Sequence, residues 1–192
     1  MPGAGVGLVA EDGRGLSEPA KVDPEVAALA FATHLDDFFS KGRGRLAGWE
    51  RIDLGPLSCV VRIPAARADG TLDMYFVMLG AEYYPVWPPR VTFVRRAGEN
   101  WTPAAAGTRW WPQQRNSPGF SFGLHASYQF PDGAARQLVC FSHSFDFYIS
   151  GHSPTDEERW QQGVHTVTAT LTRLAEVLRA PNYERPSGDR DS

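Results

Sequence analysis

The chain is poor in cysteine, with only Cys59 and Cys140 among its 192 residues. Small secreted domains are usually dense in disulfides, and two cysteines do not indicate a scaffold of that kind. We therefore expect both thiols to be reduced and the protein to be cytoplasmic. The first residues also lack the basic region and the apolar stretch of a secretory signal.

The chain lacks an excess of one charge and a long apolar run. It has 19 basic and 22 acidic side chains, for a formal net charge of −3. Proteins that bind nucleic acid or anionic membranes usually present a basic surface, which this balance does not indicate. No apolar segment approaches the roughly 18 residues of a membrane-spanning helix. The sequence therefore predicts neither nucleic acid nor a membrane as a partner.

Hydrophobic residues make up 42% of the chain, and its 11 Phe and 6 Trp predict an aromatic-rich core. The length suits one domain with irregular ends. Residues 1–22 show no hydrophobic periodicity and are predicted to be a flexible tail. We expect a single domain over residues 23–186, followed by a second flexible tail at 187–192.

Helical spacing of apolar residues predicts two helices. The first covers residues 24–39 and opens with an aspartate N-cap and a first-turn proline. The second is expected from its apolar stripe over residues 160–178, with Thr155 and Glu158 as a capping box.

Runs of β-branched and aromatic residues between the helices predict an antiparallel meander. Its four expected strands cover residues 49–54, 57–63, 72–79 and 91–94. Residues 96–119 are rich in Gly, Pro and Trp, which predicts an irregular insertion that packs on the domain or docks a partner. Residues 120–130 are expected to return as a strand and residues 139–149 to be extended. This order of elements predicts an α+β fold.

Three segments, taken in order, carry a resemblance to a known family. They are Tyr84-Pro85-Val86-Trp87-Pro88-Pro89-Arg90-Val91-Thr92-Phe93, then Phe130-Pro131-Asp132 ten residues before Cys140, and Pro181-Asn182 after the last helix. With this order and spacing the chain resembles the ubiquitin-conjugating (E2) enzymes, in particular divergent prokaryotic-type members. The resemblance covers residues 24–186 and implies the UBC-like fold: an N-terminal helix, a four-stranded antiparallel meander, a Cys-bearing loop and a C-terminal helix.

The chain departs from the family pattern at the expected site. The family has His-Pro-Asn where this chain has Phe130-Pro131-Asp132, and Trp-Ser-Pro where it has His152-Ser153-Pro154. The segment 96–119 is also longer than the family needs. With these differences, the resemblance implies a divergent member of the family.

The resemblance implies that Cys140 accepts a ubiquitin-like modifier from an E1-like activating enzyme as a thioester and passes it to an amine on a protein target. A thioester brings its own leaving group, so the enzyme supplies orientation, an oxyanion partner and removal of the amine proton. Asp132 stands where the family has its asparagine. It either orients or deprotonates the amine, or it caps the turn 131–133. This chemistry implies no cofactor and no metal.

His143 and His152 are further candidates, because a histidine beside the thiol can take up a proton, although each also fits an ordinary loop position. His125 and Cys59 are expected to be structural. Two alternatives stay open. The protein is a catalytically inactive E2-like scaffold that binds a ubiquitin-like partner noncovalently, or an α+β domain whose structural zinc is held by Cys140 and the three histidines.

Overall fold

A computed structural model of the chain describes residues 19–41, 44, 47–115 and 122–191. Its elements, in chain order, are α1 (Pro24–Ser40), β1 (Glu50–Gly55), β2 (Ser58–Ala66), β3 (Leu72–Gly80), β4 (Arg90–Ala97), β5 (Asn100–Pro103), β6 (Pro112–Gln114), β7 (Gly123–Gln129), β8 (Ala135–Cys140), α3 (Phe145–Ile149), α4 (Val167–Val177) and β9 (Tyr183–Pro186). The predicted α+β class is confirmed.

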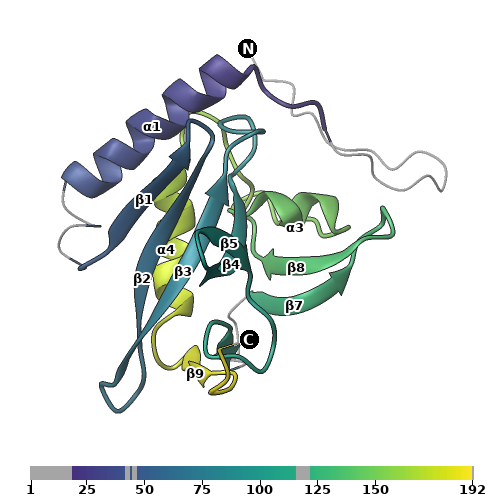
Figure 1. The fold of residues 1–192 in the computed structure, drawn as a ribbon. Helices are drawn as coiled ribbons and strands as arrows, with labels where there is room; N and C mark the ends of the chain where they lie inside the picture. Colours follow the sequence, from purple (N-terminus) through teal and green to yellow (C-terminus); the bar gives the residue numbers. More distant parts are fainter. Residues whose placement is uncertain (1–18, 42–43, 45–46, 116–121, 192) are drawn as a thin grey trace.

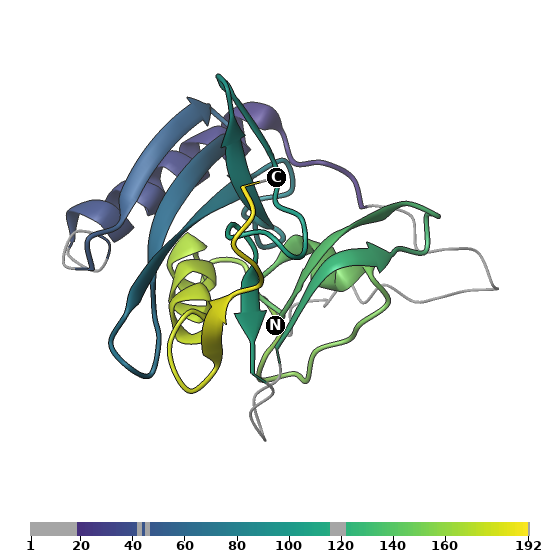
Figure 2. The same cartoon turned by 60° about the horizontal axis from the view of Figure 1, so that its bottom comes forward.

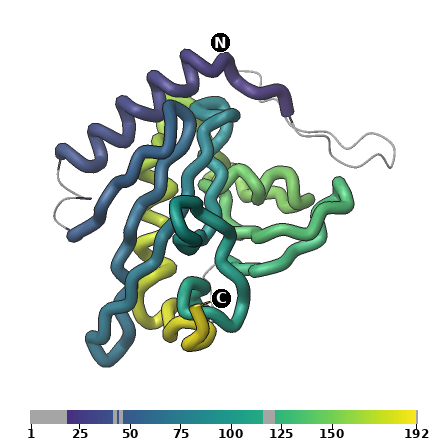
Figure 3. Tube along the Cα trace, viewed as in Figure 1, coloured from purple at the N-terminus to yellow at the C-terminus, as the bar shows by residue number. Residues whose placement is uncertain are grey.

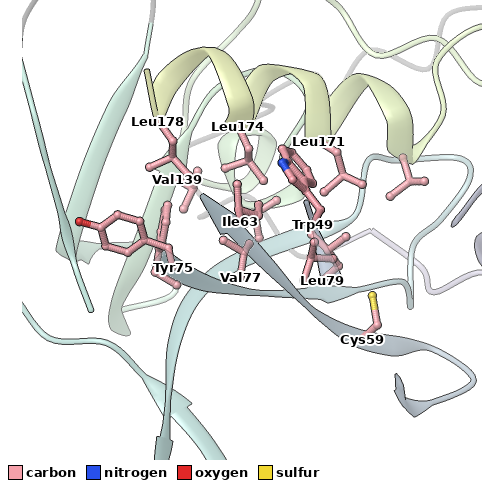
Figure 4. Close-up of a cluster of buried hydrophobic side chains, with 14 of the residues drawn as sticks. Trp49, Cys59, Ile63, Tyr75, Val77, Leu79, Val139, Leu171, Leu174 and Leu178 are labelled. Atoms are coloured by element: carbon pink, nitrogen blue, oxygen red, sulfur yellow. The ribbon is translucent and has the colours of Figure 1, made fainter. Parts of the chain in front are cut away.

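Five strands form one antiparallel sheet in the order β1-β2-β3-β4-β5, which contains the predicted meander (Figure 1). Side chains alternate across it, so Tyr75, Val77 and Leu79 of β3 are all buried on one face. Both α1 and α4 contribute to the core cluster on that face. In the close-up of this cluster, Leu171 and Leu174 of α4 lie over the sheet residues (Figure 4).

Helix α1 forms as predicted, because its cap and its apolar spacing agree. The Asp23 carboxylate accepts hydrogen bonds from the backbone N–H groups of Glu25 and Val26, at 3.0 and 3.2 Å. The helix buries Ala27, Phe31, Leu35 and Phe38 against the sheet. No helix in the described part of the chain is long and apolar enough to cross a membrane.

Helix α4 is shorter than the apolar stripe predicts, and the expected start near residue 160 is wrong. Gly163 has a φ of +82°, a left-handed conformation that interrupts a right-handed helix. The helix begins only after Thr166, whose side chain accepts from the N–H of Thr168 at 3.3 Å. Trp160 is buried outside the helix, whereas Val164 is 69% exposed.

The predicted irregular segment 96–119 is also corrected by the structure, since it contains the end of β4 and the whole of β5 and β6. Residues 116–119 lie outside the described residues. Strand β5 extends the main sheet by pairing with β4, and β6 pairs with β9. The regular pairing was missed because these strands are only four and three residues long.

The three tryptophans of this segment pack onto the domain. Trp101 and Trp110 lie over Phe76, with ring centroids 5.0 and 6.0 Å away. Trp111 is buried in the core against Phe93, at 5.5 Å. Of the two predicted roles, the structure therefore shows packing on the domain.

The end of the chain is held in place where a flexible tail over 187–192 was expected; residue 192 lies outside the description, as do residues 1–18 of the other predicted tail. Ser187 Oγ accepts from the N–H of Gly107 at 2.9 Å, and the carbonyl of Arg190 accepts from the N–H of Arg109 at 2.9 Å. Figure 3 shows this terminal segment beside the chain that leads into β6. We therefore assign residues 187–191 to the domain.

Strands β7 and β8 form a separate two-stranded hairpin that extends to one side of the main sheet, with α3 beside it (Figures 1 and 2). Only residues 139 and 140 of the predicted extended stretch 139–149 belong to a strand. The stretch turns into α3 because Phe145 and Ile149, four residues apart, bury on the same cluster.

Candidate functional site

In the β7–β8 hairpin, strand β8 is buried on both faces, whereas His125, Ser127 and Gln129 of β7 are exposed. Leu124 of β7 lies opposite Val139 of β8, and both pack on the main core. The other face carries Leu138 and Cys140, which contact a second cluster made by Tyr83, Phe130, Phe145 and Ile149. The hairpin is therefore fixed between two apolar layers, and Cys140 belongs to the smaller one.

One side chain joins this hairpin to the main sheet. Gln137 is buried, and its Oε1 accepts from the N–H of Phe93 at 2.9 Å. Its Nε2 donates to the carbonyls of Phe93 and Ala104, at 2.9 and 2.6 Å. Strand β8 is therefore positioned against β4 three residues before Cys140.

Cys140 is the last residue of β8 and is half-buried, whereas Cys59 in β2 is fully buried. Neither cysteine is in a disulfide. Burial raises the pKa of the Cys140 thiol, and burial raises the pKa of Cys59 to about 12. Cys140 is thus the accessible thiol of the two, and it stays protonated at neutral pH unless a neighbour accepts its proton.

His125, which the sequence predicts to be structural, lies beside Cys140. Gly123 pairs directly with Cys140 across the hairpin. A β-carbon on Gly123 would lie 2.9 Å from His125 Nε2 and 3.4 Å from the Cys140 β-carbon. The missing side chain leaves a space that the imidazole and the cysteine share. The sequence signal for this pair was the Gly-x-His pattern on a strand facing the cysteine, and it requires the hairpin register to be known.

His152 lies near His125 on the same side of the hairpin. Its ring stacks on Phe147 at 5.3 Å, and its Nδ1 makes a hydrogen bond of 2.7 Å with Ser150 Oγ. Tyr128 lies between the two histidines, with ring centroids 5.5 Å from His125 and 6.0 Å from His152. Burial, together with the charge of His152, lowers the pKa of His125, so its imidazole is neutral at neutral pH.

Asp132 is not brought to Cys140. It lies in the turn at the tip of the hairpin, where its carboxylate accepts from the N–H of Ala134 and pairs with Arg136, both at 2.8 Å. These hydrogen bonds lower the pKa of Asp132. Cys140 lies at the opposite end of β8, five residue steps of about 3.3 Å from Ala135. We therefore correct the candidate catalytic role of Asp132 to that of a turn cap.

His143 faces a different part of the molecule. Its ring lies 4.9 Å from that of His165 and 6.0 Å from that of Trp160. It lines a cavity of about 420 Å³ against α4, with Arg173 and Glu176 among the other lining residues. Burial lowers the pKa of His143 to about 4. The structure therefore separates His143 from the group around Cys140.

A second cavity, of about 650 Å³, lies between the C-terminal end of α1, strands β2 and β3, and α4. Cys140 lines neither cavity. Within the described ranges, no group of three or more His, Cys, Asp or Glu side chains is arranged to hold a metal ion. The zinc alternative required Cys140 and three histidines to converge, and His143 does not join the others.

Comparisons with protein-family models, with curated proteins and with solved structures find no significant match to this chain.

Proposed function

We propose that the protein is an E2-like carrier, which accepts a ubiquitin-like modifier from an E1-like activating enzyme as a thioester on Cys140 and transfers it to an amine of a protein target. The observation that carries the proposal is the position of Cys140. It is the accessible thiol, at the end of a strand fixed by Gln137, and it follows an antiparallel meander and precedes the last helix.

The Tyr84–Phe93 segment, on which the family resemblance depends most, has a clear structural role. Tyr84 is fully buried, and its hydroxyl accepts from the N–H of Val167 at 3.1 Å and makes a short hydrogen bond with His34. The carbonyl of Pro85 accepts from the indole N–H of Trp160 at 3.0 Å. The segment therefore joins α1 to the start of α4, as a shared structural motif of a fold family would.

The replaced His-Pro-Asn residues also have packing roles here. Phe130 is buried, with the guanidinium of Arg136 3.7 Å from the centre of its ring. Asp132 caps the turn that follows. These residues hold the hairpin tip, so any assistance to the thiol must come from other side chains.

The raised pKa of Cys140 favours a second candidate, a noncovalent E2-like scaffold for a ubiquitin-like partner. A thiol that remains protonated is a poor nucleophile, because the thiolate is the reactive form. The two candidates differ in one respect only. A carrier forms a covalent intermediate on Cys140, and a scaffold does not.

The test is to combine the protein with a modifier, its E1-like enzyme and ATP, and to run a non-reducing gel. We expect a shifted band that collapses with thiol reductant, is lost in Cys140→Ala and is retained in the matched variant Cys59→Ala. No band, with the E1-like enzyme shown to carry the modifier itself, would contradict the carrier. Binding that persists without a band would then support the scaffold. A band that resists reductant but yields to base would indicate an ester on a hydroxyl such as Ser142.

A further inference from the structure

We propose that His125 is the proton acceptor for the Cys140 thiol, so that the hairpin carries a thiol–imidazole pair. The use of this pair in thioester transfer rests on the proposed function. The pair itself is a property of the hairpin and can be tested without a modifier.

The strand register places the two side chains on one face. Residues directly opposite each other in an antiparallel pair point to the same side, and so do residues two apart on one strand. Gly123 is opposite Cys140, and His125 is opposite Leu138. His125, Leu138 and Cys140 therefore share the face that packs toward α3, and the place of Gly123 between them holds no side chain.

Glycine at position 123 is required for this approach. Its φ lies outside the left-handed region, so another residue could adopt the same backbone. A β-carbon there would lie 2.9 Å from His125 Nε2, closer than unbonded atoms of this kind approach. The imidazole therefore occupies space that any other residue at 123 would fill.

The surroundings of His125 suit a proton acceptor. Among the described residues, the titratable groups recorded near His125 are Tyr128 on its own strand, Cys140 on β8, and His152 from the segment after α3. None of these is an acid that would stabilise a permanently charged imidazolium. Burial and the charge of His152 lower the pKa of His125, and burial raises that of Cys140. A neutral base therefore lies beside a protonated thiol, which is the arrangement that general-base catalysis uses.

In thioester exchange every proton that is released is also taken up. As Cys140 Sγ bonds to the carbonyl carbon of the modifier, its proton passes to His125, the thioester bond to the E1-like enzyme breaks, and the proton goes to the departing E1 thiolate. In the transfer step the target amine bonds to the same carbon, and its proton passes through His125 to Sγ as the Cys140 thioester breaks. No oxidant, metal or further reactant is needed.

The test is alkylation of the full-length protein by iodoacetamide between pH 5 and pH 10, with the rate at each cysteine followed by mass spectrometry. In the wild type we expect Cys140 to retain reactivity below pH 8, with an inflection below the usual histidine pKa. In His125→Gln we expect its rate at pH 7 to be about tenfold lower, the effect of one pKa unit on the thiolate fraction. The two profiles should converge near pH 10, where hydroxide deprotonates the thiol. The matched control is His165→Gln, which alters a histidine that packs on His143 and Trp160 instead of on the hairpin face of Cys140.

A second variant tests the geometry without removing the imidazole. Gly123→Ala should displace His125 and slow Cys140 alkylation at pH 7 as His125→Gln does. Its control is Gly55→Ala, a strand glycine at which an added β-carbon meets nothing within 4 Å.

Superimposable profiles for the wild type, His125→Gln and Gly123→Ala would overturn the inference. An equal decrease of the Cys140 alkylation rate in the two control variants would also overturn it, because the decrease would then reflect a general change in the stability of the protein. The alkylation test and the non-reducing gel for the thioester can give different answers. A profile that depends on His125 with no thioester band would retain the pair and remove the carrier, whereas a band with no dependence on His125 would do the reverse.

Discussion

Gln137 is the residue on which the position of the hairpin depends most directly. Its side-chain amide makes both kinds of hydrogen bond to the backbone of Phe93 and a third bond to the carbonyl of Ala104. The side chain of Gln137 thereby links β8 to β4, two strands that share no backbone pairing. Buried backbone groups that lose a partner are costly, since water cannot replace it.

We expect Gln137→Leu to lower the free energy of unfolding by about 3 kcal/mol, because the N–H of Phe93 and the carbonyl of Ala104 lose this partner. The carbonyl of Phe93 keeps its hydrogen bond from the N–H of Ala104. Urea denaturation followed by tryptophan fluorescence measures this loss. The matched control is Gln129→Leu on the partner strand, whose side chain makes one exposed hydrogen bond to Gly133. A loss no larger than that of the control would contradict the role of Gln137.

Among the elements, the terminal segment after β9 depends on two glycines that approach each other closely. A β-carbon on Gly188 would lie 2.3 Å from the carbonyl oxygen of Gly107. The hydrogen bonds of Ser187 and Arg190 to residues 107–111 lie on either side of this contact. A larger residue at 188 must therefore separate the two chain segments.

We expect Gly188→Ala to release the terminal segment while the main sheet stays folded. Hydrogen exchange should show faster exchange of the backbone amides of Gly107, Arg109 and Ser187, by about tenfold or more, because their hydrogen bonds are lost. The amides of β2 and β3 serve as the internal reference. Unchanged protection at these three amides would show that the glycine contact does not hold the segment.

How far the sequence predicts each element depends on whether its signal is local. Helix α1 is predicted well because its N-cap and its apolar spacing lie within the helix itself. Helix α4 is predicted too long because the apolar stripe continues through Gly163, whose left-handed φ cannot be read from spacing. The pairing of Gly123 and His125 with Cys140 depends on a register between two strands. That register depends on contacts with elements such as β4, which lies well before the hairpin in the chain.

The residues of the candidate site also differ in whether a local signal predicts their position. The burial of Cys59 agrees with the structural role expected from its place in a predicted strand. Asp132 and His143 lie close to Cys140 in sequence but are separated from it in the structure. One lies beyond the full length of β8, and the other turns toward α4. Proximity in sequence therefore does not show which side chains lie beside Cys140, whereas the strand register places His125 on the same face of the hairpin.

For the molecule as a whole, the half-buried His143 makes folding depend on pH. The folded state holds the pKa of His143 at about 4, from its ordinary 6.5. Between these values the unfolded chain binds a proton that the folded protein does not. Stability is therefore full above about pH 6.5 and decreases as the pH falls toward 4.

We expect the wild type to lose about 1 kcal/mol more stability than His143→Gln between pH 7 and pH 5, after a discount for solvent screening of this half-buried ring. Thermal unfolding of both proteins across this range measures the difference in slope. The difference in stability between the two proteins at pH 8 gives the effect of the substitution when the histidine is neutral in both the folded and the unfolded state. Parallel curves from pH 8 to pH 5 would show that His143 does not carry this dependence.

The complete burial of Cys59 makes its alkylation rate a measure of how often the sheet opens. Its thiol lies in β2, between β1 and β3, and reaches solvent only when the meander opens. In one alkylation experiment, the early mass increment reports the native surface at Cys140. The late increment, at Cys59, appears only when the sheet is open. Its rate, divided by the rate of alkylation of an unstructured peptide, gives the fraction of molecules in the open state.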